Sequence, residues 1–264
     1  MPIGYSLHIG LNKIDPRHYA GSAGRLNSSE SDALSMQALA KSMGFTDKIL
    51  LTNEAVRERV IHLIADASQK LLDDDLFFIS YSGHGGLLPN LNNDPEPVGY
   101  DQTWCLFDGQ LVDDELKQLW VSFKPGVRIL AVSDSCFSGT MLHFHSTGLK
   151  NSKILPPAVL KETYLRNQAF YDKILARPNV PGERINASVL LLASCLDNQE
   201  SLDGPFNSVF THHLLNVWNN GTFTGNYKAF INEISRSTPS SQIPQLKEEG
   251  LPNISFLNSP PFKI

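Results

Sequence analysis

Short apolar runs along the chain alternate with longer segments in which apolar residues recur at helical spacing. Continuous apolar runs are typical of strands that are buried on both faces of a sheet. Apolar runs of this kind predict strands at Tyr5–Leu11, Lys48–Leu51, Leu76–Ser82, Val127–Ser133 and Ser188–Ser194.

The segments between these strands carry amphipathic patterns. An apolar stripe from Ala33 to Met43 predicts one helix, and Asn53 has the residue type of an N-cap before a second pattern that ends at Leu71. Helices are predicted at Glu30–Met43, 53–71, Asp113–Trp120, Val209–Trp218 and Tyr227–Ser235. Strands that alternate with helices indicate an α/β fold with a central, mainly parallel sheet and helices on both faces.

Two connections are too long to be simple turns. Gly85–Gln102 is rich in Pro, Asn and Gly, whereas His143–Asn186 is longer, less apolar and contains several Lys and Arg residues. Connections of this length without secondary structure are usually functional or disordered. We therefore expect each of the two segments to be either functional or disordered.

Composition limits the kind of partner. The chain has 264 residues, a formal net charge of -5 and no basic run. Binding to nucleic-acid phosphates requires clustered Lys and Arg, so the sequence argues against nucleic acid as the main partner. The mild acidity fits either a basic substrate or an ordinary solvated surface.

The sequence also indicates a compartment. It lacks both an apolar stretch of about 18 residues, the length of a membrane span, and the basic and apolar regions of a secretory signal. Its three cysteines, Cys105, Cys136 and Cys195, cannot all pair in disulfides. A sparse, odd set suggests a reducing compartment and leaves a thiol free to react. We therefore expect no membrane span and a cytoplasmic location.

Two motifs follow two of the predicted buried strands. SYSGHGG contains His84 at the end of the strand Leu76–Ser82, and SDSCFSG contains Cys136 at the end of the strand Val127–Ser133. In open α/β sheets, ligands bind at the carboxyl ends of the strands. One histidine and one cysteine are therefore predicted to lie at a ligand-binding edge.

This pair can carry out nucleophilic catalysis. A free cysteine has a pKa of about 8.5 and is mostly protonated at neutral pH, so it needs a base. His84 can take the thiol proton of Cys136 and later protonate a leaving amine. Gly83, Gly85 and Gly86 leave room for a substrate backbone, and the N–H groups of Gly85 and Cys136 can form an oxyanion hole.

The same motifs resemble those of a known family. YSGHG and DSCFSG, with Cys136 52 residues after His84, are similar to the motifs of caspase-like cysteine peptidases, and most similar to the metacaspase and prokaryotic orthocaspase branch. Phe137 stands where this branch has a histidine after the cysteine. The resemblance extends over nearly the whole chain through GYDQTWCLFDGQLVDDEL, ASCLDNQESLDGPFNSVFT, QIPQL and PPFKI.

The resemblance implies a single caspase-like, three-layer peptidase domain over 1–264. Its parts would be a large-subunit-like region at 1–142, a connecting segment at 143–186 and a small-subunit-like region at 187–264. It implies a cysteine endopeptidase that acts on protein or peptide substrates and requires no cofactor, with a monomer favoured. The alternative function is that of a catalytically silent caspase-like scaffold or regulatory protein.

The resemblance also implies an acidic pocket that selects Arg or Lys before the scissile bond. The matching positions are Asp32, Ser82 and Asp134. Two buried carboxylates repel each other, and a guanidinium between them would relieve that repulsion. A pocket for acidic residues would need convergent arginines instead. The simpler roles are a turn cap for Asp134 and a favourable charge at a helix N-terminus for Asp32.

Calcium is a weak candidate ligand. Asp101, Asp113 and Asp114 match positions at which the resembled branch binds calcium. A further carboxylate position of that branch carries His143 here, and the loss of a hard oxygen ligand weakens a calcium site. We therefore expect little dependence on calcium.

The remaining cysteines and histidines are expected to have no chemical role. Cys105 and Cys195 flank apolar runs and are expected to be buried, inert thiols. Carboxylate or thiolate partners at ligand spacing are missing around the paired histidines, so we expect no metal there. These histidines are His143, His145, His212 and His213.

Self-cleavage in the connecting segment is a further implication of the resemblance. Several Lys and Arg residues there offer the side chain that the predicted pocket would accept. A following proline disfavours Arg177, and a helix is predicted over 161–175. The favoured sites are Lys150, Lys153 and Arg184.

Overall fold

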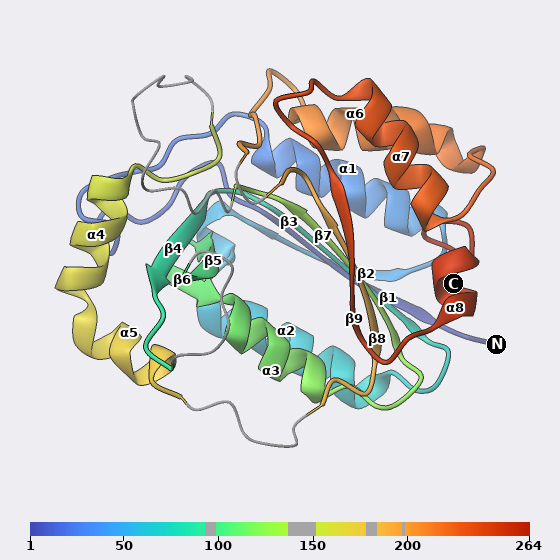
Figure 1. Cartoon of the computed structure of the whole chain (residues 1–264), viewed down its shortest axis with the longest axis horizontal. Coiled ribbons are helices and arrows are strands. Elements are labelled where there is room, and N and C mark those ends of the chain that lie inside the picture. The colour runs from blue at the N-terminus through green and yellow to red at the C-terminus, as the bar shows by residue number, and fades with distance from the viewer. Residues whose placement is uncertain (93–98, 137–151, 178–183, 197–198) are drawn as a thin grey trace.

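A six-stranded sheet forms the centre of the computed structural model, which describes residues 1–92, 99–136, 152–177, 184–196 and 199–264 (Figure 1). The strand order is β2-β1-β3-β7-β8-β9. The first five strands are parallel, and β9 is antiparallel to β8. The strands are β1 (Gly4–Gly10), β2 (Thr46–Leu51), β3 (Leu76–Ser82), β7 (Arg128–Asp134), β8 (Ser188–Ala193) and β9 (Gln245–Gly250).

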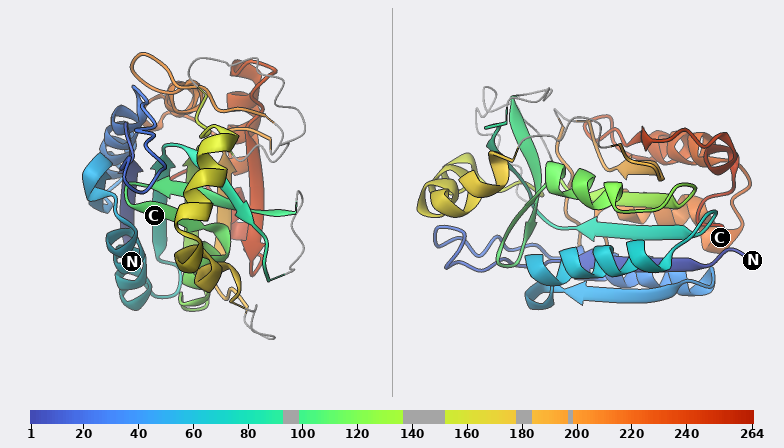
Figure 2. Two further views of the ribbon diagram at one scale, coloured as in Figure 1. Left: turned by 90° about the vertical axis from the view of Figure 1, so that its left-hand side faces the viewer. Right: turned by 90° about the horizontal axis from the view of Figure 1, so that it is seen from below.

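Helices cover both faces of this sheet (Figures 1 and 2), which confirms the predicted α/β architecture. One face carries α1 (Ser29–Ser42), α6 (Val209–Trp218), which continues into η2 (Asn219–Gly221), α7 (Tyr227–Ser237) and α8 (Ile254–Asn258). The other face carries α2 (Arg57–Lys70) and α3 (Asp113–Val121). None of the helices in the described part of the chain is long and apolar enough to cross a membrane.

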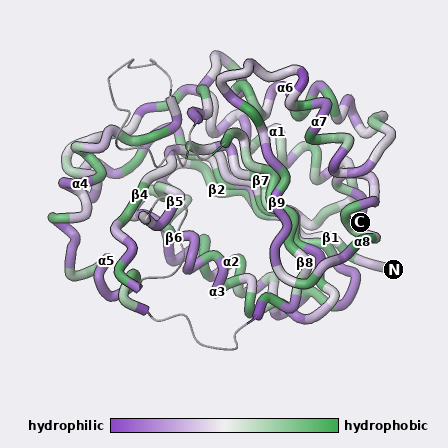
Figure 3. The backbone as a smooth tube through the Cα atoms, in the orientation of Figure 1, coloured by the Kyte–Doolittle hydropathy of each residue, from purple (hydrophilic) through white to green (hydrophobic). Residues whose placement is uncertain are grey.

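The two central strands are buried along their whole length. Every residue of β3 and β7 is buried, because a helical layer packs against each face. Phe77 and Ile79 belong to the core beneath α2 and α3, whereas Phe78 belongs to the core beneath α1, α6 and α7. The hydrophobic colouring of the central strands in Figure 3 reflects this burial on both faces, which explains their continuous apolar sequences.

Both long connections contain secondary structure, of which the sequence analysis predicted only a helix over 161–175. The first contributes β4 (Gly85–Pro89) and the start of β5 (Tyr100–Leu106), which form a small antiparallel sheet with β6 (Gly109–Val112). The second contains α4 (Pro157–Arg166) and α5 (Gln168–Leu175) beside this small sheet (Figure 1). The helix expected over 161–175 is therefore two helices, separated at Asn167.

The prediction that Asn53 caps the second helix was wrong. Asn53 lies within a short 3-10 helix, η1 (Thr52–Glu54), and α2 begins at Arg57. The backbone N–H of Arg57 donates to Asp108 Oδ1 at 2.8 Å. A side chain 51 residues away thus satisfies the first amide of α2, in place of a local cap.

Phe78 tests the core beneath α1, α6 and α7. Its ring lies 5.0 Å from the His8 ring and 5.2 Å from the Phe262 ring, measured between centroids. Phe78→Ala removes these contacts and leaves a cavity, so we expect the free energy of unfolding to fall by about 3–5 kcal/mol. Urea unfolding measures this loss, with Phe206→Ala as the control because the Phe206 side chain is 80% exposed. Equal losses in the two variants would contradict the packing described here.

Candidate active site

His84 and Cys136 follow two adjacent parallel strands. β3 pairs with β7 so that Ser82 lies opposite Asp134, two residues before His84 and Cys136 respectively. The parallel register brings both motifs to the same edge of the sheet, and both side chains are buried. The structure thus brings the predicted histidine and cysteine into one region.

Gly85 allows the two motifs to approach closely. A Cβ atom at Gly85 would lie only 1.8 Å from the Cys136 carbonyl oxygen, so a larger residue would force the strands apart. The backbone N–H of Gly85 donates to the Lys153 carbonyl oxygen at 2.9 Å, and the N–H of Cys136 donates to the same oxygen at 3.3 Å. Two convergent N–H groups on one carbonyl oxygen are the arrangement of an oxyanion hole.

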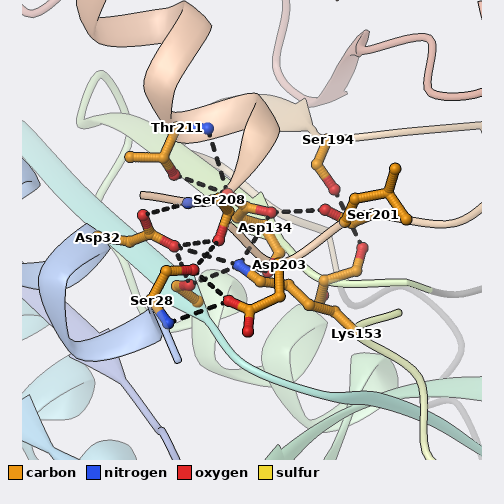
Figure 4. Close-up of polar contacts among 12 residues, drawn as sticks. Ser28, Asp32, Asp134, Lys153, Ser194, Ser201, Asp203, Ser208 and Thr211 are labelled. Carbon is orange, nitrogen blue, oxygen red and sulfur yellow. Dashed lines mark hydrogen bonds and ion pairs between the residues drawn. The ribbon is translucent and has the colours of Figure 1, made fainter. Parts of the chain in front are cut away.

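The Lys153 side chain fills the predicted acidic pocket (Figure 4). Its Nζ lies 3.2 Å from Asp32 Oδ2 and 3.2 Å from Asp134 Oδ1, and the side chain is 0% exposed. Nζ also donates to Ser82 Oγ at 2.8 Å and to the Asp134 carbonyl oxygen at 3.3 Å. The three pocket residues named from the sequence therefore meet at one point, around a lysine of the same chain.

Several neutral donors hold the Asp32 carboxylate. Ser82 Oγ donates to Asp32 Oδ2 at 2.7 Å, and the Ser208 N–H donates to Asp32 Oδ1 at 2.9 Å. The Ser208 hydroxyl and the Asn207 amide add two more hydrogen bonds. Because a buried carboxylate is stable only when its acceptors are filled, these donors help to keep Asp32 in place.

The Asp134 carboxylate is held in the same way. Ser201 Oγ donates to its Oδ1 at 2.6 Å, and Thr211 Oγ1 donates to its Oδ2 at 2.7 Å. Burial raises the pKa of Asp134, the positive charge of Lys153 opposes this effect, and the like charge of Asp32 adds to it. Burial acts to lower the pKa of Lys153, but the two carboxylates outweigh it and leave that pKa above its ordinary value. The lysine therefore stays charged.

The His84 imidazole is held in its neutral form. Burial lowers its pKa to about 4, and the nearby Lys153 charge also lowers it. The Gly24 and Lys153 backbones flank the ring and act in the opposite direction. Within the described residues neither ring nitrogen has a hydrogen-bond partner. A neutral imidazole with a free nitrogen can accept a proton at physiological pH.

The Cys136 thiol lies against the loop after β8. The backbone N–H of Ser201 donates to its Sγ at 2.7 Å, and Sγ lies 3.3 Å from the Ser201 carbonyl oxygen. An N–H donor stabilises a thiolate more than a thiol. Cys105 and Cys195 are buried, as expected from the sequence. Burial raises the pKa of Cys105, whereas contact with Cys136, together with burial, raises that of Cys195.

Backbone hydrogen bonds and bridges hold residues 152–155 on both sides. The N–H of Lys153 donates to the Ser201 carbonyl oxygen at 3.0 Å, and Ser152 forms an antiparallel bridge with Leu202. Beyond the lysine, Ile154 forms a parallel bridge with Gly85. A peptide substrate that adds a strand to a protease site makes backbone contacts of the same kind.

The other two predicted cleavage sites are placed differently. Lys150 lies outside the described residues. Arg184 is exposed and precedes Ser188, at the amino end of β8. This is the edge of the sheet opposite His84 and Cys136. Cleavage after Lys150 or Arg184 stays a prediction.

The calcium candidates lie on β5 and at the start of α3. Lys117 Nζ pairs with Asp113 at 3.4 Å and with Asp114 at 3.1 Å, and burial raises the pKa of Asp113 to about 6. Asp101 is buried on β5. The described residues contain no group of three or more His, Cys, Asp or Glu side chains placed to hold a metal ion. Asp113 and Asp114 already share a lysine, and the expected weak dependence on calcium stays a prediction.

Sequence reasoning assigned no role to the loop between β8 and α6. Asp203 accepts hydrogen bonds from the backbone N–H groups of Asn27 and Ser28 and from the Ser28 hydroxyl, just before α1 (Figure 4). Asp203 thus ties the loop to the segment before α1, while Ser201 and Ser208 tie it to the carboxylates of Asp134 and Asp32. In the sequence, the family resemblance of the segment ASCLDNQESLDGPFNSVFT pointed to this loop, but it did not identify Ser201, Asp203 or Ser208 individually.

The amino-acid sequence is similar to a known protein family and to several of its members. A sequence profile described as the caspase domain matches residues 14–254. Metacaspase-1 of Schizosaccharomyces pombe is 34% identical over 173 residues, which cover 60% of this chain and 39% of that protein. Metacaspase-1A of Aspergillus clavatus is 33% identical over 185 residues, with 62% and 39% covered. The chain therefore spans about two fifths of the length of these relatives.

Two solved structures resemble the fold. Protein GSU0716 from Geobacter sulfurreducens is 44% identical, with a TM-score of 0.93 and 99% of each chain covered. Caspase-1 from Spodoptera frugiperda is 12% identical, with a TM-score of 0.55 over 93% of this chain and 86% of that one. The second similarity is one of fold alone.

Lys153→Met tests the ion pairs in the pocket. The substitution leaves two buried carboxylates without their counter-charge, so we expect the free energy of unfolding at pH 7 to fall by about 3–5 kcal/mol. Loss of the lysine also raises the pKa of Asp134 further, since Lys153 acts to lower it. The protein loses stability as pH rises through the raised folded-state pKa of a buried carboxyl, so the defect should shrink as pH falls from neutrality into the acidic range.

Urea unfolding at several pH values measures this effect. Lys161→Met is the matched control, because Lys161 is exposed on α4. A defect in Lys153→Met that is independent of pH, or equal to that of the control, would show that the pocket charges do not interact as described.

Proposed function

The chain belongs to the caspase domain family, and on that premise we propose that it is a cysteine endopeptidase that cleaves peptide bonds after lysine or arginine. The observation that carries this proposal is the position of Lys153. Its side chain lies between Asp32 and Asp134, while its carbonyl oxygen accepts hydrogen bonds from Gly85 and Cys136. One residue thus makes the contacts that a basic substrate residue would make before a scissile bond.

The proposed reaction uses His84 and Cys136. The neutral imidazole accepts the thiol proton, and Cys136 Sγ attacks the carbonyl carbon of the basic residue. The N–H groups of Gly85 and Cys136 stabilise the negative charge that develops on the carbonyl oxygen. The imidazolium then protonates the leaving amine, and a water molecule hydrolyses the thioester. The low pKa of His84 favours rapid loss of this proton to the amine.

Charge explains the proposed specificity. Asp32 and Asp134 supply two buried carboxylates, and Ser82 supplies a hydroxyl that can accept a hydrogen bond from an ammonium or guanidinium group. An acidic side chain would place a third negative charge in this pocket, so it should be rejected. Protein or peptide substrates with exposed basic residues are the proposed partners. The three free cysteines agree with a cytoplasmic location, which is also a proposal.

Two substitutions test the proposed dyad. Because both groups take part in bond cleavage, Cys136→Ala should abolish hydrolysis of a lysine peptide, and His84→Ala should lower kcat by about 100- to 10,000-fold. Turnover is measured at saturating peptide, since residues 152–155 occupy the same site. His212→Ala is the control, because His212 is exposed on α6. Unchanged turnover in Cys136→Ala with an intact circular dichroism spectrum would reject the assignment.

A peptide library tests the pocket. We expect lysine and arginine to lead at the position before the cleaved bond, with aspartate and glutamate at background. Asp134→Asn removes one charge of a buried ion pair and should lower kcat/KM for lysine peptides by about 100-fold or more. Asp73→Asn, on an exposed loop, should leave it unchanged. A profile led by aspartate or by apolar residues would refute the proposed specificity.

A further inference from the structure

The chain on the carboxyl side of Lys153 is anchored independently of the pocket. Leu155 is 1% exposed and belongs to the same hydrophobic core as Leu160 of α4 and Trp104 of β5. Its N–H donates to the Gly85 carbonyl oxygen at 3.4 Å, and Ile154 is buried beside it. None of these contacts involves Lys153.

α4 reinforces this anchor. It begins at Pro157, two residues after the buried Leu155, and packs against β4. A Cβ atom on Gly86 of β4 would lie 2.9 Å from Leu160 Cδ2, so helix and strand are in close contact. The amino group that a cut after Lys153 would release therefore belongs to a short, fixed segment.

We infer that the protein cuts and re-forms its own Lys153–Ile154 peptide bond, so that residues 152–155 act as a built-in reversible inhibitor. This inference rests on the proposed endopeptidase function and adds a second activity, peptide-bond formation. Its basis is that both sides of the bond stay bound to the site, through separate contacts. The Lys153 side is held by the pocket, and the Ile154 side is held by the core.

The reaction balances in both directions. Cys136 Sγ bonds to the Lys153 carbonyl carbon, the bond from that carbon to Ile154 N breaks, and the proton taken by His84 passes to Ile154 N. The products are a thioester at Cys136 and a free amine at Ile154. In the reverse direction the amine attacks the thioester, Cys136 leaves as a thiolate, and the proton returns to His84. No other reactant is needed.

Proximity decides which direction prevails. A well-oriented intramolecular nucleophile has an effective concentration of about 10⁵–10⁸ M, far above that of any amine in solution. The anchored Ile154 amine therefore returns the thioester to peptide more often than water hydrolyses it. The chain stays intact although the bond is attacked repeatedly, and a substrate gains access only when the segment leaves the site.

Hydroxylamine tests this inference, because it is a small nucleophile that competes with the Ile154 amine for the thioester. The purified full chain is incubated at neutral pH with and without hydroxylamine, and intact-mass spectrometry follows the products. We expect the wild type to stay whole in buffer and to split when hydroxylamine is added, faster at higher concentration. The first fragment should end in a hydroxamate at Lys153.

Variants of the anchor and of the nucleophile complete the experiment. Leu155→Ala loosens the segment, so this variant should split in buffer alone, with a carboxylate at Lys153. Leu155→Met keeps an apolar anchor and should behave as the wild type. Cys136→Ala should stay whole under all conditions. The hydroxylamine result for the wild type stands even if Leu155→Ala folds poorly.

Hydrolysis of a lysine peptide is measured in the same samples, so that failure of the inference is distinguished from failure of the proposed function. A wild type that splits equally fast with and without hydroxylamine would show one-way cleavage and overturn the inference. A wild type that cleaves the peptide but resists hydroxylamine would overturn it and leave the proposed function intact. A wild type that cleaves neither bond would overturn both.

Discussion

The ammonium group of Lys153, held between the carboxylates of Asp32 and Asp134, is the interaction on which the site depends. It joins three parts of the chain that are distant in sequence: α1, the end of β7 and the segment before α4. Two buried carboxylates this close would repel each other without a cation. Serine hydroxyls of the loop after β8 and the Thr211 hydroxyl of α6 complete the hydrogen bonding. The pocket is thus stable in this form because its own chain supplies the positive charge.

The central sheet was the most predictable part of the fold. β3 and β7 are buried on both faces, so their sequences are continuously apolar and point to strands without any knowledge of their neighbours. β4 and β9 give no such signal. The sequence of β4, GGLLP, contains two glycines and a proline, and that of β9, QLKEEG, is mostly polar. Each is a strand because a partner, β5 or β8, supplies its hydrogen bonds.

The candidate site divides in a similar way. The motifs around His84 and Cys136 end neighbouring parallel strands, so their meeting follows from local sequence and sheet topology. The sequence does not predict which residue occupies the pocket, because the connecting segment contains several basic residues that could do so. Lys153 is placed there by the core contacts of Leu155 and by backbone pairing with Ser201, which are tertiary effects. Asp203 was missed for the same reason. Its partners, Asn27 and Ser28, are about 175 residues away in sequence, and only the folded chain brings them together.

Because of the order of strands in the sheet, the fold depends little on an intact peptide bond after Lys153. β8 follows the segment 152–155 in sequence but lies directly beside β7, and Phe210 and Tyr227 share a core with Phe78 and Leu130. A molecule broken after Lys153 would keep all of these contacts. It would scatter light and migrate through a sizing column as one particle of unchanged mass, and only a denaturant would reveal two polypeptides. In this architecture, two separate polypeptides can therefore form one folded particle.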